Sequence, residues 1–100
     1  MNIESDKNRD KTIEYVVYIL ETSDGSLYCG WTLDLERRLK EHNSSNSKTK
    51  YTRSRRPVTV VYWEEYDMKS DAMKREYQIK QLNRKEKLKL CRLFLYEKSN

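Results

Sequence analysis

Residues 15–43 read YVVYILETSDGSLYCGWTLDLERRLKEHN, and this segment determines how the rest of the chain must fold. Its first half holds two short apolar runs, 15–21 and 27–32, rich in aromatic and β-branched residues, which is typical of β-strands. An Asp24-Gly25 pair between the runs is a strong hairpin signal, because Gly takes φ > 0 at little cost. The two strands are therefore predicted to be antiparallel neighbours.

The length of the turn decides which side chains share a face, because a slip of one residue moves every side chain to the other face of the sheet. A two-residue turn would place Tyr18 beside Trp31 and leave Tyr28 on the opposite face. A three-residue turn that ends at the same glycine would place Tyr18 opposite Gly30. Both phenols would then share one face.

The helix predicted over residues 35–43 carries two polar residues on its apolar side. At 100° per residue, Leu35, Arg38, Leu39 and His42 fall within an arc of about 100°. An Arg and a His on a core-facing side are costly unless they have partners or line a cleft. For either residue alone, we favour the simpler interpretation: Arg38 reaches out at the rim, or His42 is a satisfied packing residue. The two together, beside two tyrosines, favour a functional site.

These residues resemble the GIY-YIG nuclease domain family. The two motifs that name the family correspond to Val16-Val17-Tyr18 and Tyr28-Cys29-Gly30. Arg38 follows ten positions beyond the second tyrosine, and His42 follows four positions later. The small Gly of the first motif and the Ile of the second are replaced, but both tyrosines and the final Gly remain.

The resemblance continues through residues 51–57 and 73–80 and covers roughly residues 14–90. Within the family, the chain looks most like the small stand-alone bacterial members that consist of the nuclease domain alone. We expect a mobile leader over residues 1–12, a single α+β domain over 13–97 and a tail over 98–100. The expected fold is a three-stranded antiparallel sheet flanked by three helices, in the order β-β-α-β-α-α.

Local signals place the remaining elements. The first two strands are apolar on both faces, which predicts helices on both sides of the sheet. Thr32 or Asp34 is a candidate N-cap for the first helix, and a third strand is predicted over 58–63. Ser70 is the expected N-cap of the second helix, and Asn83 with Glu86 begins the third as a capping box. The apolar side of that third helix is predicted to comprise Leu88, Cys91, Phe94 and Leu95.

The segment 43–57 is the most basic part of the chain and contains no acid. Its cations and one interleaved aromatic residue are Lys48, Lys50, Tyr51, Arg53, Arg55 and Arg56. Phosphates attract Lys and Arg, and exposed bases stack on aromatic rings, so this composition favours contact with nucleic acid. The simpler interpretation is a solvated loop without regular structure.

A glutamate lies on the predicted packed side of the second helix, where Met73, Glu76, Tyr77 and Lys80 share one side and Ala72 and Ile79 adjoin it. Two interpretations stay open on the residues alone. Glu76 pairs with Lys80 at i, i+4, which is worth about 0.3–0.5 kcal/mol when exposed, or it is a metal ligand. The family resemblance favours the ligand, and Lys80 is then assigned to the nucleic-acid contacts.

The resemblance implies that the catalytic residues are Tyr18, Tyr28, Arg38, His42 and Glu76, converging on one concave face. Tyr18 would be the general base, and Tyr28 would hydrogen-bond water or phosphate, although the sequence does not assign which tyrosine takes the proton. A phenol near pKa 10 is a poor base at neutral pH, so nearby positive charge would have to lower that pKa. Arg38 would hold the scissile phosphate, and His42 would orient a tyrosine or the phosphate.

Glu76 would hold one Mg²⁺ or Mn²⁺ ion. A single carboxylate suffices, because Mg²⁺ keeps several waters and takes substrate phosphate oxygens as further ligands. Asn83 could complete such a site as an amide, but its capping pattern already explains it.

Composition limits the class of protein. The chain has 100 residues and a net charge of +5, from 21 basic and 16 acidic residues, which suits one globular domain with a polyanionic partner. Cys29 and Cys91 lack metal-ligand spacing and are interpreted as reduced packing residues. No apolar run approaches the ~20 residues of a membrane span, and the polar N-terminal residues are unlike a signal peptide. We expect a cytoplasmic monomer without an organic cofactor.

The predicted function is therefore a metal-dependent endonuclease that acts on DNA rather than RNA, in DNA repair or recombination. The alternative is a non-catalytic or weakly active nucleic-acid-binding module that retains the nuclease fold, because fold does not fix function. Retention of all five implied catalytic residues favours the enzyme. A protein-interaction module that uses the aromatic surface has the least support.

Overall fold

The computed structural model describes residues 14–45 and 48–99, so the predicted leader over 1–12 lies outside the described residues. The elements follow in the order β1 Tyr15–Glu21, β2 Leu27–Thr32, α2 Leu35–Asn43, α3 Lys50–Arg53, β3 Thr59–Tyr66, α4 Lys69–Gln81 and α5 Arg84–Ser99. The strands form one antiparallel sheet in the order β2-β1-β3. The predicted α+β fold is confirmed, with one addition: α3 is a single helical turn inside the segment expected to lack regular structure.

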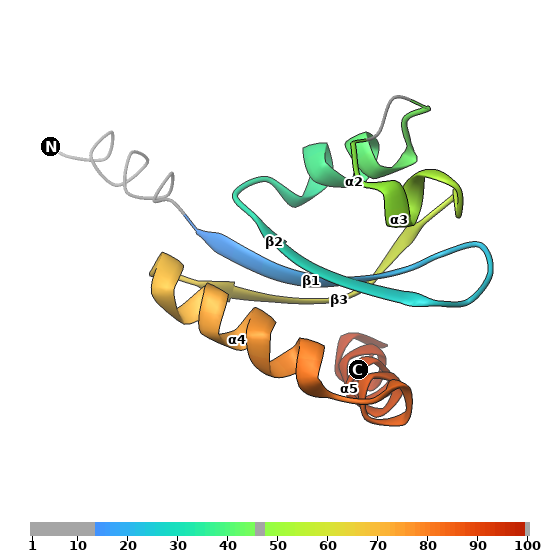
Figure 1. Ribbon diagram of the computed structural model, residues 1–100. Helices are drawn as coiled ribbons and strands as arrows, with labels where there is room; N and C mark the ends of the chain where they lie inside the picture. Colours follow the sequence, from blue (N-terminus) through green and yellow to red (C-terminus); the bar gives the residue numbers. More distant parts are fainter. Residues whose placement is uncertain (1–13, 46–47, 100) are drawn as a thin grey trace, which may run out of the picture.

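The layers of the molecule are visible in Figure 1, where α2 and α3 lie on one face of the sheet and α4 and α5 on the other. β1 is the central strand, and its residues from Val16 to Leu20 are all buried. This agrees with the prediction of helices on both sides, because a strand covered on both faces has no polar side to present to water. None of the described helices is long and apolar enough to cross a membrane.

The hairpin adopts the register that puts both tyrosines on one face. Tyr18 pairs with Gly30, and Leu20 pairs with Tyr28. Gly25 has φ +84°, the left-handed conformation that a three-residue turn requires at this position. Thr22 N–H donates to the Ser26 carbonyl oxygen at 2.9 Å and closes the turn.

A charged cluster joins α4 to β3 on the face opposite α2. Arg75 Nε donates to Glu64 Oε1 at 2.9 Å, and Arg75 Nη2 donates to Glu64 Oε2 at 3.0 Å. The hydroxyls of Tyr62 and Tyr66 donate to the same carboxylate. Burial opposes ionisation of Glu64, but the hydrogen bonds from Arg75 and the two tyrosines lower its pKa. Glu64 thus remains charged and fixes the helix to the strand.

Two predictions about α4 were wrong. The helix begins at Lys69 with Met68 as its N-cap, two residues before the predicted N-cap Ser70. Its buried side is centred on Ala72 and Ile79, both fully buried, whereas Met73 and Tyr77 are 47% and 66% exposed. Alanine at the centre lets the helix approach the sheet closely, so the buried arc is narrow and the larger side chains lie outside it.

The ends of α5 and of α2 agree with the local signals. Asn83 and Glu86 exchange two hydrogen bonds of 2.8 Å as a capping box, and Asp34 accepts from Arg37 N–H at 3.0 Å as the N-cap of α2.

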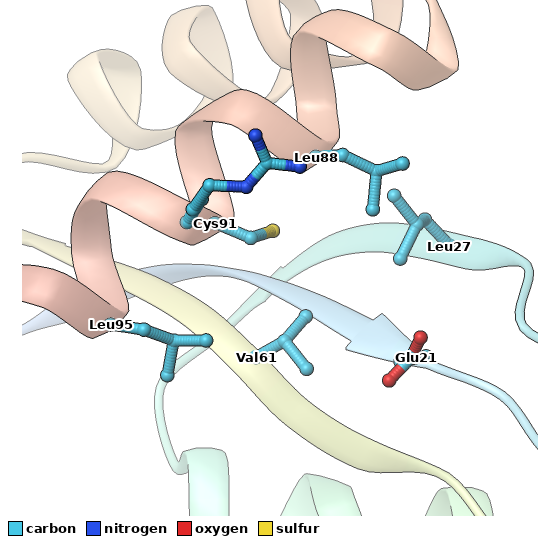
Figure 2. A pocket seen from close by; sticks show the side chains of 7 residues that line it. Glu21, Leu27, Val61, Leu88, Cys91 and Leu95 are labelled. Atoms are coloured by element: carbon cyan, nitrogen blue, oxygen red, sulfur yellow. The ribbon is translucent and has the colours of Figure 1, made fainter.

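On α5, Cys91 is buried as predicted, but Leu95 is 56% exposed. A cavity of about 200 Å³ lies between this helix and the sheet (Figure 2). Leu95 borders the cavity instead of filling the core, which corrects the predicted apolar side.

Candidate active site

Tyr18 and His42 form a buried pair between the sheet and α2. Tyr18 comes from the middle of β1 and His42 from the last turn of α2, and each is 1% exposed. Tyr18 Oη lies 3.1 Å from His42 Nε2. The histidine that the sequence placed among leucines therefore does have a partner, which is what its burial requires.

Gly30 and Tyr28 of β2 complete the wall beside this pair. A Cβ atom at Gly30 would lie 2.7 Å from Tyr18 Oη, so only glycine lets the Tyr18 ring pass over the backbone of β2. The ring of Tyr28 lies edge-on to His42, with centroids 5.2 Å apart. Tyr28 is only partly buried, so of the two phenols it is the one nearer to solvent.

Thr52 determines where the proton of His42 lies. Thr52 is fully buried in α3, and its hydroxyl donates to the Thr49 carbonyl oxygen at 3.3 Å. A hydroxyl has only one proton to donate, so toward His42 Nδ1, 2.8 Å away, its oxygen accepts. This arrangement favours the imidazole proton on Nδ1, which leaves Nε2 as the acceptor for the Tyr18 hydroxyl.

Arg38 supports the same proton arrangement. Its guanidinium hydrogen-bonds the Tyr18 hydroxyl and pairs with Glu41, with 3.0 Å between Nη1 and Oε1. Because guanidinium has donors and no acceptor, the Tyr18 oxygen must accept from Arg38, and its own proton is free to point at His42 Nε2. Residues from β1, α2 and α3 thus form one continuous hydrogen-bond chain.

The charge states of this chain follow from burial. Desolvation raises the pKa of Tyr18 to about 12, and the hydrogen bond and charge of Arg38 oppose this only in part. Desolvation, followed by the positive charge of Arg38, lowers the pKa of His42 below its usual range. Both groups are therefore neutral at pH 7 in the free protein, which is the state that the hydrogen-bond directions also require.

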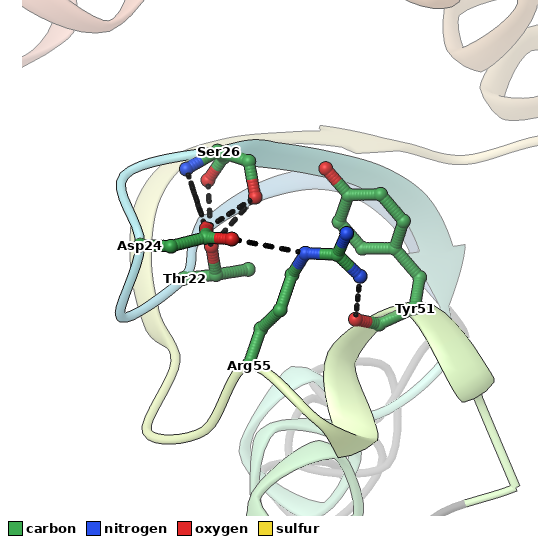
Figure 3. A network of polar contacts seen from close by, with 5 residues as sticks. All are labelled: Thr22, Asp24, Ser26, Tyr51 and Arg55. Atoms are coloured by element: carbon green, nitrogen blue, oxygen red, sulfur yellow. Dashed lines mark hydrogen bonds and ion pairs between the residues drawn. The ribbon is translucent and has the colours of Figure 1, made fainter.

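A second polar network holds the outer wall of the site (Figure 3). Tyr51 of α3 lies 5.7 Å from Tyr28 between ring centroids, and the Arg55 guanidinium covers the Tyr51 ring at 4.2 Å. Arg55 Nε in turn donates to Asp24 in the hairpin turn at 3.1 Å. Hydrogen bonds from Thr22 and Ser26, with the charge of Arg55, lower the pKa of Asp24. The turn between β1 and β2 therefore anchors the aromatic residue that covers Tyr28.

Glu76 lies apart from these residues. It is in α4, which packs on the opposite face of the sheet, and its side chain is 19% exposed. Its carboxylate pairs with Lys80 at 3.3 Å, so the predicted ion pair is present. Its charge also contributes, after burial, to raising the pKa of Cys29 in β2 to about 12. Glu76 thus lies near Cys29 on the side of the sheet opposite α2, so the structure does not bring it together with the four other residues on the single concave face that was predicted.

No group of three or more potential metal ligands occurs among the described residues. A site enclosed by protein side chains alone therefore does not fit this part of the chain. One carboxylate is still compatible with Mg²⁺, which keeps most of its waters. The assignment of Glu76 as a metal ligand stays a prediction, as do the catalytic roles of the other four residues.

The predicted nucleic-acid residues are divided between α3, the segment around it and α4. Lys48, Lys50, Arg53 and Arg56 are exposed on the side of the sheet that carries the tyrosines, and Lys80 is exposed on α4. Arg56 Nε donates to the Arg53 carbonyl oxygen at 2.9 Å. These cations surround Tyr51 and Arg55, so the structure brings the basic segment next to the tyrosine site.

Sequence reasoning missed Thr52, the role of Asn43 and the contact between the turn residue Asp24 and Arg55. Asn43 bonds both backbone groups of Val58, at 2.7 and 3.1 Å, and so ties the end of α2 to the start of β3. The lack of any acid in 43–57 was a usable signal for Asp24, because a buried or ordered arginine needs an acid from elsewhere. Nothing in the sequence marked Thr52, because a one-turn helix has too little periodicity to reveal a buried face.

Comparison with known proteins places this arrangement in context. The model of the GIY-YIG catalytic domain matches residues 14–89. A UPF0213 protein of Syntrophus aciditrophicus is 55% identical over 76 residues, which are 76% of this chain and 87% of that protein. A UPF0213 protein of Staphylococcus saprophyticus is 49% identical over 77 residues, 77% of this chain and 93% of its own length. The names of these relatives state no activity.

Two solved structures have the same fold. The solution NMR structure of a UPF0213 protein from Bacillus halodurans has a TM-score of 0.54 and 43% identity, over 81% of this chain and 85% of that one. The solution NMR structure of a protein from E. faecalis gives a TM-score of 0.55 and 36% identity. That match covers 82% of this chain and 88% of the other.

Proposed function

Since the chain belongs to the GIY-YIG catalytic domain family, we propose that it is a metal-dependent endonuclease that hydrolyses phosphodiester bonds in DNA. The observation that carries this proposal is the polar chain from half-buried Arg38 through the buried residues Tyr18 and His42 to Thr52. A structural role alone would not require four polar side chains from three elements to satisfy one another in a small core. DNA rather than RNA, a role in repair or recombination, and a cytoplasmic location are part of the proposal.

Burial divides the work between the two tyrosines. The family resemblance assigns the general base to Tyr18, but its hydroxyl is buried and already donates to His42 in the free protein. Tyr28 is partly exposed and packs against His42, so we assign the contact with water or phosphate to Tyr28. A proton that leaves Tyr18 would move to His42 Nε2, and the resulting phenolate would lie beside Arg38, which stabilises negative charge.

Arg38 and the basic segment supply the remaining interactions with substrate. Arg38 is half-buried and permanently charged, so it suits a phosphate whose charge redistributes during cleavage. Glu76 would hold the Mg²⁺ or Mn²⁺ ion, which would supply charge stabilisation for the phosphoryl group and the leaving oxygen. Because α4 lies on the other face of the sheet, the ion would have to meet the phosphate around the edge strand β2. The exposed cations from Lys48 to Arg56 would bind flanking phosphates.

A non-catalytic nucleic-acid-binding module is the second candidate, and one observation favours it. The Glu76 carboxylate already pairs with Lys80 on the face opposite the tyrosines. If that pair is structural, the chain keeps the fold and the basic surface without holding a metal. Glu76→Gln separates the two candidates, because it preserves size and hydrogen bonding but removes the charge that would hold the ion.

The experiment measures cleavage, binding and thermal melting together. Branched, single-stranded and duplex DNA are incubated with Mg²⁺ or Mn²⁺ and either the wild type, Glu76→Gln or the exposed control Glu65→Gln. Under the enzyme proposal, Glu76→Gln cleaves slower by orders of magnitude, yet binds DNA as well as the wild type. A less stable Glu76→Gln protein that cleaves at the normal rate per folded molecule would end the metal-ligand assignment. A wild type that binds all three substrates without cleaving any would support the binding module.

A further inference from the structure

One exposed side of the N-terminal half of α5 is basic. Arg84, Lys85, Lys89 and Arg92 follow the spacing i, i+1, i+5 and i+8, which places them within an arc of about 140° on the helix. All four are exposed, and with Leu88 they line a groove of about 540 Å³. None of them belongs to the segments that the sequence analysis assigned to nucleic-acid contact.

The other helices show that this is more than an ordinary solvated surface. The exposed positions of α2 mix Glu36 and Glu41 with Arg37 and Lys40. On α5 the first-turn acid, Glu86, is occupied by the capping box. Within residues 14–45 and 48–99, no salt bridge neutralises the four α5 cations, whereas Arg38, Arg55, Arg75 and Lys80 each have an acidic partner.

The hairpin turn connects this face with the basic segment of the active-site side. Arg84 Nη2 lies 4.0 Å from the position that a Cβ atom of Gly25 would occupy. On the other side of the same turn, Ser23 N–H donates to the Arg55 carbonyl oxygen at 2.9 Å, and Asp24 pairs with the Arg55 side chain. In Figure 1, α3 lies above and α5 lies below the sheet at the end where this turn is found.

We propose that the basic face of α5 is a second nucleic-acid contact surface, which binds phosphates flanking the site after the strand passes the hairpin turn. This inference rests on the proposed function, since it extends the footprint of the same substrate. The residues from Arg84 to Arg92 span roughly 12 Å along the helix at 1.5 Å per residue. Phosphates recur about every 3.4 Å along one strand, so the face matches three to four of them.

The test compares two double variants that remove the same charge. Lys85→Ala/Lys89→Ala alters the α5 face, and Lys69→Ala/Lys74→Ala removes two exposed lysines from α4 as the control. Each is titrated against a DNA duplex of about 20 base pairs, which spans roughly 68 Å, and against a hairpin of about 8 base pairs, which spans roughly 27 Å. Affinity is measured as a function of salt, and melting temperature is measured for each protein.

For the long duplex, the α5 variant should bind more weakly and its slope of log K against log salt should fall by about 1 for each lysine. Its affinity for the short hairpin, its melting temperature and both affinities of the α4 control should match the wild type. An α5 variant that behaves like the α4 control on the long duplex overturns this inference and leaves the proposed function standing. A wild type that binds no nucleic acid overturns both.

Discussion

His42 is the residue on which the site depends, because each of its ring nitrogens has one buried partner. Nδ1 lies 2.8 Å from Thr52 and Nε2 lies 3.1 Å from Tyr18. The direction of both hydrogen bonds follows from the Thr52 hydroxyl. It donates its single proton to the Thr49 carbonyl oxygen and therefore accepts from His42 Nδ1. Thr52 is therefore a positioning residue, which acts on Tyr18 only through the histidine.

This arrangement predicts the tautomer of His42. The chain contains one histidine, so ¹⁵N NMR of the imidazole reports on this site without assignment ambiguity. The wild type and Thr52→Ser should carry the proton on Nδ1, whereas Thr52→Val, which keeps the shape but removes the Nδ1 acceptor, should weaken this preference and raise the fraction of molecules with protonated Nε2. A wild type with protonated Nε2 would contradict the proposed direction of the chain.

A pH titration followed by the same ¹⁵N signals should give a His42 pKa below the unfolded value of about 6.5, because burial and Arg38 disfavour the imidazolium. The native state then binds fewer protons than the unfolded state. His42 therefore costs no stability above about pH 6.5, and the free energy of unfolding decreases as the pH falls toward and through the folded-state pKa of His42. Denaturant unfolding at several pH values measures this decline.

At the scale of elements, local signals predicted what depends on neighbours in sequence. The Asp24-Gly25 turn determines the hairpin register, and the register alone puts Tyr18 and Tyr28 on one face. The buried side of α4 was missed because periodicity gives a helix an apolar arc without showing where its centre meets the sheet. Tyr77 was placed inside by that arc, but its amphipathic ring lies 66% exposed.

The charged cluster between α4 and β3 predicts a difference between two adjacent glutamates. Glu64→Gln leaves the Arg75 guanidinium without its charged partner in a half-buried position, so the free energy of unfolding should fall by about 1–3 kcal/mol. Glu65→Gln changes an exposed neighbour and should stay within about 0.5 kcal/mol of the wild type. Equal denaturation curves for the two variants would show that the cluster contributes no net stability.

The pH dependence of that difference has a definite sign. The folded-state pKa of Glu64 is lowered by Arg75 and the two tyrosines. Its stabilisation is therefore present above the unfolded pKa of about 4.3 and is lost as the pH falls through the lower folded value. The gap between the wild type and Glu64→Gln should narrow in acid.

For the whole molecule, the net charge of +5 predicted a polyanionic partner but not where it binds. The segment 43–57 was recognised because its cations are contiguous in sequence. The cations of α5 alternate with leucines and acids along the chain, and they form one face only when the buried side of the helix is known. A surface of this kind requires the packed structure, since hydropathy and charge patterns do not locate the sheet that covers the helix.

The basic segment and the α5 face should respond differently to the length of DNA. Lys48 and Lys50 lie beside the tyrosine site, so Lys48→Ala/Lys50→Ala should lower the slope of log K against log salt by about 2 for both the short hairpin and the long duplex. The α5 pair should act on the long duplex alone.

Because the two pairs lie on opposite sides of the sheet and share no partner, the quadruple variant should show the sum of the two effects on the long duplex. Fluorescence anisotropy titrations over a salt series measure all four proteins. A Lys48→Ala/Lys50→Ala variant whose slope of log K against log salt equals that of the wild type would place the binding face away from α3.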